Sequence, residues 1–283
     1  TTLFRSKQAF IEYCSGNVLF PEKVSVIFDE QNQSRINCLP AGIIKKNIFG
    51  MKWVSVFPNN PSNYGISNLT ANIILSDLKT GFPIAFMEGS MCSNLRTAGI
   101  STLAATFLAK NNPVSIGFIG AGEQAKTHFL SMKSAFPSIK YCNVASRTDA
   151  SENKFVEQMK NFYDDVSYKK CHSDYKQAVK DVDIIVTAIS GQEKILQADW
   201  ISNGVFYCHV AGLEDDFSVA LKADKIVCDN WEAVKHRTQT ISQMYKLGLL
   251  KDKDIHANLD EIIMKKKTPR ENDDEFIYFN GVG

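Results

Sequence analysis

A pair of closely spaced glycines, placed between a short apolar run and a helical segment, constrains this 283-residue chain more than any other feature. Residues 114–119 form an apolar run typical of a buried parallel strand, and residues 123–136 have a helical pattern. The glycine-rich junction between them follows the G-x-G-x-x-A form, with Gly120, Gly122 and Ala125 at its fixed positions. A second strand follows about 20 residues later, as a dinucleotide-binding βαβ unit requires.

Each small residue of the junction has a chemical reason to be there. Gly120 permits the tight turn, and Gly122 lets the backbone approach a pyrophosphate at the helix N-terminus. Ala125 replaces the third glycine, which is an accepted variant. We therefore predict that Gly120, Gly122, Glu123, Gln124 and Ala125 bind a dinucleotide. The alternative is a strand–helix turn without a ligand.

Strands and helices alternate after a break at residues 110–113, and this alternation predicts an α/β fold with a doubly wound parallel sheet of Rossmann type. The expected strands cover residues 114–119, 141–145, 184–188, 205–210, 225–228 and 276–279. The first third has a strand at 71–75, a loop at 58–65 and a helix at 96–109, but no self-sufficient sheet pattern. We predict two domains, residues 1–110 and 111–283, and suspect that a C-terminal element is missing.

The end of the second strand bears on the choice of dinucleotide. An acid there would favour NAD, but the chain has Ser146, Arg147 and Thr148, which we also assign to the cofactor. Arg147 can contact a 2′-phosphate, so NADP is slightly favoured, unless Arg147 is a surface residue beside an NAD ribose. Ala188 and Ser190, after the strand at 184–188, complete the predicted cofactor site.

Bulk composition excludes several other classes. The net charge of +1 argues against a nucleic-acid partner, and no apolar stretch is long enough to cross a membrane. The seven cysteines and five histidines are scattered, which predicts no metal site and a reducing, cytoplasmic location.

Two further motifs carry a resemblance, together with the glycine-rich junction. Arg96-Thr97-Ala98-Gly99 precedes the glycine-rich junction, and Lys52 stands in Met51-Lys52-Trp53-Val54. Together they resemble the ornithine cyclodeaminase/μ-crystallin family over nearly the whole chain. Residues 83–88, 222–227 and 273–275 are most similar to the members that form 2,3-diaminopropionate in siderophore biosynthesis.

The resemblance implies an N-terminal α/β domain that binds substrate and forms a homodimer. It implies that Arg96 holds a substrate carboxylate, Thr97 faces the cofactor phosphates and Lys52 lies at the reacting carbon. Lys23 and Arg35 match the same subgroup and are assigned to the substrate, with Arg35 a candidate for a second carboxylate. The alternatives are an ion pair for Arg96 or Lys52 and exposed surface charges for Lys23 and Arg35.

One segment departs from the cyclodeaminases, which carry a catalytic Asp after a late strand. Glu214 is the best positional match here and Asp215 the second, so either is a candidate base, while Glu214 could instead be a helix N-terminal acid. The longer side chain argues against ornithine cyclisation.

The function that follows is an NAD(P)-dependent oxidoreductase acting on the C–N bond of a small amino-acid-derived substrate. The resemblance implies oxidation and hydrolysis of N-(2-amino-2-carboxyethyl)-L-glutamate to 2,3-diaminopropionate and 2-oxoglutarate. The alternatives are an ornithine cyclodeaminase, a ketimine reductase, an alanine dehydrogenase, or a dinucleotide-binding protein without catalysis.

Overall fold

The computed structural model describes residues 2–281, which divide into two compact units. One unit is Lys7–Asn94, and the other comprises the rest of the described chain. The division falls inside the helix α3 (Ser90–Leu108), whereas the sequence placed its boundary at residue 110, after that helix. Each unit has a sheet of its own. Between residues 2 and 281, no helix is both long and apolar enough to cross a membrane.

The larger unit contains an eight-stranded sheet in the order β13-β12-β14-β11-β10-β7-β8-β9, and every pairing in it is parallel. Its strands are β7 (Ser115–Ile119), β8 (Tyr141–Ala145), β9 (Ser167–Lys170), β10 (Ile184–Thr187), β11 (Phe206–His209), β12 (Lys225–Cys228), β13 (Ala257–Asn258) and β14 (Ile277–Asn280). The order β9-β8-β7-β10-β11 is the Rossmann order 3-2-1-4-5. The predicted doubly wound α/β fold is confirmed.

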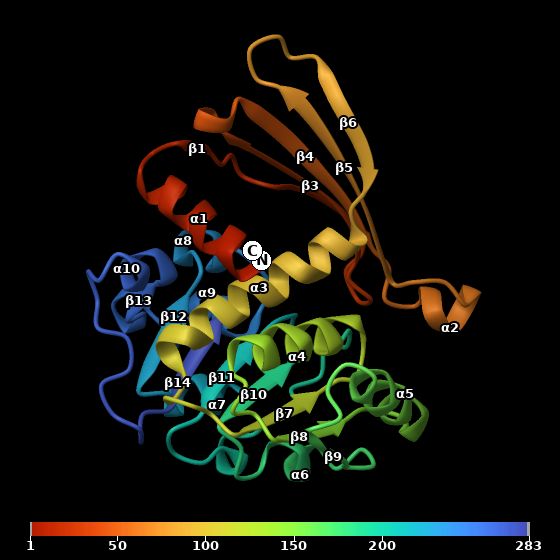
Figure 1. Ribbon diagram of the computed structural model, residues 1–283, viewed down its shortest axis with the longest axis vertical. Helices are drawn as coiled ribbons and strands as arrows, with labels where there is room; N and C mark the ends of the chain where they lie inside the picture. The colour runs from red at the N-terminus through yellow and green to blue at the C-terminus, as the bar shows by residue number, and fades with distance from the viewer. Residues whose placement is uncertain (1, 282–283) are drawn as a thin grey trace. The chain divides into compact units, whose positions relative to one another are not determined.

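Helices follow most of these strands and cover the sheet (Figure 1). They are α4 (Glu123–Ala135), α5 (Asp149–Lys160), α6 (Tyr175–Val179), α7 (Phe217–Lys222), α8 (Trp231–Val234), α9 (Thr240–Lys246) and α10 (Leu259–Ile263), with 3₁₀ turns at Ala198–Trp200 and Asp252–Asp254. Strands β7, β10, β11 and β14 are buried along their whole length, because both faces of the sheet are covered. On one face Phe118 packs against Phe129 and Phe155. Tyr207 and Tyr278 belong to a separate apolar cluster.

The last strand, β14, does not lie at an edge of the sheet. It pairs with β11 on one side and β12 on the other, so the end of the chain returns to the middle of the sheet (Figure 1). This position brings Asn280 and Gly281 to the carboxyl edge of the parallel strands, where ligands bind in folds of this kind.

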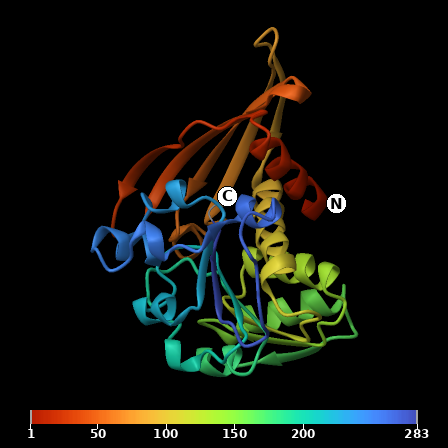
Figure 2. The same cartoon turned by 90° about the vertical axis from the view of Figure 1, so that its left-hand side faces the viewer.

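The smaller unit has a six-stranded antiparallel sheet, seen as the twisted red and orange strands in Figure 2. Its strands are β1 (Val18–Leu19), β2 (Val24–Asp29), β3 (Ser34–Ile43), β4 (Ile48–Val56), β5 (Leu69–Asp77) and β6 (Pro83–Glu88), with a 3₁₀ turn at Ile44–Lys46. The order is β1-β3-β4-β5-β6, and β2 also pairs with β3. The expectation of no self-sufficient sheet pattern was wrong. Apolar side chains occur on both faces of strands such as β4, which hides the two-residue alternation that marks a half-buried strand.

Two local predictions in this region also need correction. The helix expected at 96–109 begins at Ser90, where the Ser90 hydroxyl accepts a hydrogen bond from the backbone N–H of Ala71. The loop expected at 58–65 contains a short helix, α2 (Asn60–Tyr64). Pro61 is tolerated there because it lies in the first turn, and the helix ends at Gly65, whose φ is 67°. The helix α1 (Thr2–Cys14) runs across the division between the two units.

Candidate functional site

The turn between β7 and α4 has one glycine that the fold requires and one that it does not. Gly120 has a φ of 106°, and a Cβ at this position would lie 2.4 Å from the carbonyl oxygen of Ala188. Gly122 has an ordinary φ of −79°, and a Cβ there would meet nothing within 4 Å. Steric demands of the fold therefore explain Gly120 but not Gly122.

The start of α4 lies directly after this turn. Gly122 is the N-cap residue, and no side chain caps the helix. Glu123 is exposed and its carboxylate accepts a hydrogen bond from Lys126 Nζ at 2.7 Å, while Ala125 is fully buried. The N-terminus of α4 thus presents backbone N–H groups beside open space, which is the arrangement that binds a phosphate.

The loop after β8 contains the residues predicted to face the adenosine end. Ser146 is buried and its backbone N–H donates to Glu152 Oε1 at 2.9 Å, while Thr148 caps α5 by accepting from the N–H of Ser151. Arg147, between them, is exposed. The Glu152 carboxylate also accepts the backbone N–H groups of the segment after β9, so it holds two loops together.

Glu152 also belongs to a group of three potential metal ligands. Its carboxylate, Asp149 and His172 have ligand atoms within 4.8 Å of one another. Both Glu152 oxygens already accept backbone N–H groups, and Asp149 pairs with His172 Nδ1 at 3.1 Å. Hydrogen bonding accounts for this cluster, and the absence of a metal site stays a prediction.

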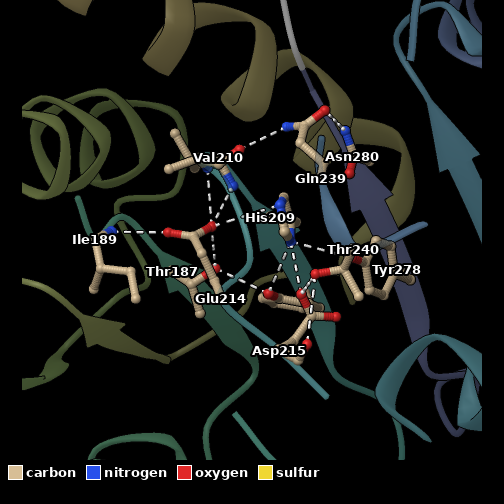
Figure 3. A network of polar contacts seen from close by, with 12 residues as sticks. Thr187, Ile189, His209, Val210, Glu214, Asp215, Gln239, Thr240, Tyr278 and Asn280 are labelled. Carbon is tan, nitrogen blue, oxygen red and sulfur yellow. Dashed lines mark hydrogen bonds and ion pairs between the residues drawn. The ribbon is translucent and has the colours of Figure 1, made fainter. Parts of the chain in front are cut away.

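Glu214 belongs to the loop that follows β11, and its carboxylate contacts both that loop and the loop that follows β10 (Figure 3). Its Oε1 accepts the backbone N–H of Ile189 at 2.8 Å. Its Oε2 accepts the Thr187 hydroxyl at 2.8 Å and the N–H groups of Val210 and Ala211 at 3.2 and 2.9 Å. Glu214 has no exposed surface. Of the predicted cofactor residues in the first of these loops, Ala188 is half-buried and Ser190 is exposed.

Asp215 forms a second buried group with His209, at the end of β11 (Figure 3). Asp215 Oδ1 lies 2.8 Å from His209 Nδ1 and accepts the Thr240 hydroxyl at 2.7 Å. Burial lowers the pKa of His209, but the carboxylates of Asp215 and Glu214 outweigh that effect, and the net result is a raised pKa. His209 Nε2 is 3.8 Å from Glu214 Oε2, so the imidazole ring lies between the two buried carboxylates.

Arg96 and Thr97 lie with Ser101 and Gly281 around a hollow that is too small to hold a water molecule. Burial lowers the pKa of Arg96 to about 10, opposed by the nearby charge of Asp229 at the end of β12. Because a pKa of that size still leaves the guanidinium protonated at neutral pH, Arg96 is a fixed positive charge beside the hollow.

A buried histidine on α4 contacts Ser101 beside this hollow. His128 Nδ1 donates to the Gln124 carbonyl at 2.7 Å, since a carbonyl can only accept. His128 Nε2 is 2.9 Å from the Ser101 hydroxyl and therefore accepts from it when the ring is neutral. Burial lowers the pKa of His128 to about 4, which favours this neutral form. No pattern in the sequence marked His128, because its partner Ser101 belongs to a different helix.

Lys52, Arg35 and Lys23 lie in the smaller unit. Lys52 Nζ donates to the Ser93 hydroxyl at 3.1 Å, and the strand register places Arg35 on the same face of the sheet as Lys52. Arg35 donates to the carbonyl of Gln33 at 2.8 Å, and burial lowers its pKa. Lys23 is exposed, just before β2. The roles of these three residues in substrate binding and catalysis stay predictions.

Comparison with known proteins places this geometry in a family. The profile of the "Ornithine cyclodeaminase/mu-crystallin family" matches residues 3–283. N-((2S)-2-amino-2-carboxyethyl)-L-glutamate dehydrogenase of Staphylococcus aureus is 28% identical over 280 residues, covering 98% of this chain and 83% of its own length.

Two solved structures resemble the whole chain. Delta(1)-pyrroline-2-carboxylate reductase of Thermococcus litoralis, in complex with NADH and L-proline, has a TM-score of 0.93 at 28% identity and covers 100% of this chain and 87% of its own. An archaeal alanine dehydrogenase dimer with bound NAD has a TM-score of 0.87 at 28% identity, with coverages of 100% and 85%. The chain therefore belongs to the ornithine cyclodeaminase/mu-crystallin family, and the prediction that it is an oxidoreductase enzyme is confirmed.

Proposed function

We propose that the chain uses a nicotinamide dinucleotide to oxidise or reduce the carbon–nitrogen bond of a small amino acid or imine. The observation that carries this proposal is the contrast between Gly120 and Gly122: the fold requires the first glycine, while the second leaves the open space that a pyrophosphate needs to approach the backbone. The residues fit a dinucleotide: the uncapped N-terminus of α4 suits the pyrophosphate, and the loop holding Ala188 and Ser190 adjoins the same turn. The solved relatives hold NADH and NAD.

The choice between the two dinucleotides depends on Arg147. It is exposed at the end of β8, where a 2′-phosphate is recognised in this fold, and Ser146 and Thr148 beside it carry no charge. An arginine there adds a charge-assisted contact to a phosphate and none of comparable strength to a ribose hydroxyl. We therefore favour NADP slightly, with NAD as the alternative that the solved relatives support.

For the substrate, we propose N-(2-amino-2-carboxyethyl)-L-glutamate. Loss of hydride to the oxidised dinucleotide and of a proton to solvent converts its secondary amine to an imine. Water adds to the imine carbon, and cleavage of the C–N bond gives 2,3-diaminopropionate and 2-oxoglutarate. The dinucleotide supplies the hydride chemistry when bound, and the protein supplies position and charge.

The residues proposed for these tasks differ in kind. Arg96 is a permanent cation, suited to hold a substrate carboxylate. Lys52 donates to the Ser93 hydroxyl and is suited to move a proton near the reacting carbon. Arg35 and Lys23 would bind the further carboxylates that this substrate carries. The resemblance to a dehydrogenase named for this substrate supports the proposal. Those to an alanine dehydrogenase and a pyrroline-2-carboxylate reductase make smaller substrates the second candidate.

We also propose that the enzyme is a homodimer joined through the smaller unit. The strand register places Val24, Val26, Trp53 and Phe86 on one face of the sheet, opposite to the face of Lys52. Their exposed fractions are 62, 52, 45 and 72%. Apolar side chains clustered in this way mark a surface that another protein covers, and the solved alanine dehydrogenase is a dimer.

A substrate screen tests the proposed reaction directly. N-(2-amino-2-carboxyethyl)-L-glutamate, L-alanine and L-proline are each offered with NAD and NADP, and the reduced dinucleotide is followed by its absorbance. We expect kcat/KM to be highest for the first compound, with 2-oxoglutarate formed in equal amount. If only L-alanine or L-proline is oxidised, the proposed substrate is wrong, but the proposal of a dinucleotide-dependent enzyme acting on a carbon–nitrogen bond stands. No turnover with any of the three compounds would overturn the substrate proposal and its second candidate.

Two variants test the assigned residues. Lys52→Ala should lower kcat by about 100-fold, as loss of proton transfer does, with KM little changed. Arg96→Ala should mainly raise the substrate KM, because a carboxylate anchor acts in ground and transition states alike. Lys79→Ala removes an exposed lysine of the smaller unit and should behave as the wild type. Wild-type turnover in Lys52→Ala would remove Lys52 from the site.

A further inference from the structure

We infer that Glu214 is a positioning residue of the dinucleotide site, which fixes the loops beside the glycine-rich turn, and that it is not the catalytic base. This inference rests on the proposed function, because it assigns a role within that cofactor site. Glu214 joins the loop after β10 to the loop after β11 through a single carboxylate (Figure 3).

Four donors hold the carboxylate. Oε2 accepts from the N–H groups of Val210 and Ala211 and from the Thr187 hydroxyl, and Oε1 accepts the Ile189 N–H. A general base needs a lone pair within reach of the proton that it removes, and the Glu214 carboxylate has no exposed surface at which a substrate or a water molecule could present that proton. Its geometry is that of a fixed acceptor.

The loop that Glu214 holds is the one against which the glycine-rich turn packs. The Ala188 N–H donates to the Ile119 carbonyl at 2.9 Å, and the Ala188 carbonyl is the atom that a Cβ on Gly120 would strike. Ile189, the next residue, donates to Glu214 Oε1. The contacts therefore run from the carboxylate through the loop to the turn, at the point where strand order reverses on either side of β7.

The imidazole ring of His209 lies beside both buried carboxylates. His209 Nε2 lies 3.8 Å from Glu214 Oε2, and His209 Nδ1 lies 2.8 Å from Asp215. Asp215 therefore forms the hydrogen bond to His209, whereas Glu214 accepts hydrogen bonds from the backbone of the two loops.

The main test is Glu214→Gln. The glutamine amide has only one oxygen, so at least one N–H donor of the loops faces an NH₂ group. Calorimetric titration with NADH and NADPH should show a dissociation constant raised about tenfold or more, the size expected when a buried donor loses its acceptor. Amide hydrogen exchange at Ile189 should accelerate, while kcat at saturating dinucleotide and its pH profile should stay within about threefold of wild type.

Asp183 supplies the matched control. Its Oδ2 accepts the backbone N–H groups of Val114 and Ser115 and the Ser115 hydroxyl, at the amino ends of β7 and β10. It is therefore a comparable acceptor at the opposite edge of the same sheet. Asp183→Asn should lower the melting temperature and leave dinucleotide affinity unchanged.

Three results separate the explanations. If Glu214→Gln keeps wild-type dinucleotide affinity and loses about 100-fold or more in kcat with an altered pH profile, Glu214 is the base and the inference is wrong. If the variant does not fold, Thr187→Val removes one donor and keeps the carboxylate, and an unchanged dissociation constant there also overturns the inference. If the wild type binds no dinucleotide, the proposed function itself fails.

Discussion

Burial of His128 predicts a specific loss of stability in mild acid. The ring is fully buried on α4, donates to the Gln124 carbonyl and accepts from the Ser101 hydroxyl. Burial lowers its pKa and the Gln124 carbonyl raises it, while the nearby charge of Arg96 lowers it, and the net pKa is about 4. In the unfolded chain the pKa of a histidine is about 6.5.

The direction of the stability change with pH depends on whether the folded or the unfolded chain binds the proton. Between these two pKa values the unfolded chain is protonated and the folded one is not, so acid favours unfolding. The contribution of neutral His128 to the free energy of unfolding is therefore fully present above about pH 6.5 and is lost progressively as the pH falls to about 4. At about pH 5 the loss from this one group amounts to about 2 kcal/mol, from about 1.4 kcal/mol per pKa unit.

The assay is urea unfolding of wild type and His128→Gln at about pH 7.5 and about pH 5, compared as a double difference so that the titration of other groups cancels. Glutamine keeps groups that can bond to Gln124 and Ser101 but cannot titrate. His236→Gln replaces an exposed histidine and should retain the wild-type pH dependence. If wild type and His128→Gln lose the same free energy of unfolding between the two pH values, the reasoning about buried neutral His128 is refuted.

Three further predictions concern the cofactor and the assembly. Gly122→Val should leave the melting temperature within a few degrees of wild type and abolish dinucleotide binding. Gly120→Val should prevent folding, because Gly120, unlike Gly122, has a positive φ and a carbonyl oxygen where a Cβ would lie. Equal affinity of Gly122→Val and wild type would contradict the site. Arg147→Ala should reduce kcat/KM with NADP about tenfold and hardly change it with NAD, and a native preference for NAD would argue against the role of Arg147. Light scattering should show a dimer that Trp53→Glu weakens and Tyr64→Glu, an exposed aromatic on α2, does not; a wild-type monomer at micromolar concentration would refute the proposed interface.

The sequence predicted the glycine-rich turn because the chemistry that it needs is local. Gly120, Gly122 and Ala125 lie within six consecutive residues, and the strand and helix that flank them have clear periodicities. The same local character made six of the eight described strands of the parallel sheet predictable, since each of the six contains a short apolar run. The sequence missed β9 and β13, because β9 is mostly polar and β13 has only two residues. Their order is not local, and no pattern indicated that β14 lies between β11 and β12.

The surroundings of Glu214 and Asp215 could not be predicted in the same way. Glu214 was singled out from its place in a motif, but its hydrogen-bond donors include Thr187 and Ile189, which precede it by about one whole βα unit. Asp215 accepts from Thr240, on a helix that follows it. Such contacts depend on which loops meet at the carboxyl edge, and that is decided by strand order.

The helices of the larger unit give a reason to place the anion at α4 in particular. Side chains at the N-cap accept a backbone N–H at α5, α6, α7 and α8, through Thr148, Asp174, Asp216 and Asn230, whereas the N-cap residue of α9, Gln239, makes no such bond. Unlike α9, α4 directly follows the glycine-rich turn. At α4 the N-cap residue is Gly122, which has no side chain to offer. A glycine at the N-cap costs only about a few tenths of a kcal/mol relative to a capping side chain, so the fold tolerates it. In the proposed cofactor site a pyrophosphate would accept the N–H groups that no side chain caps, and its binding would offset that small cost.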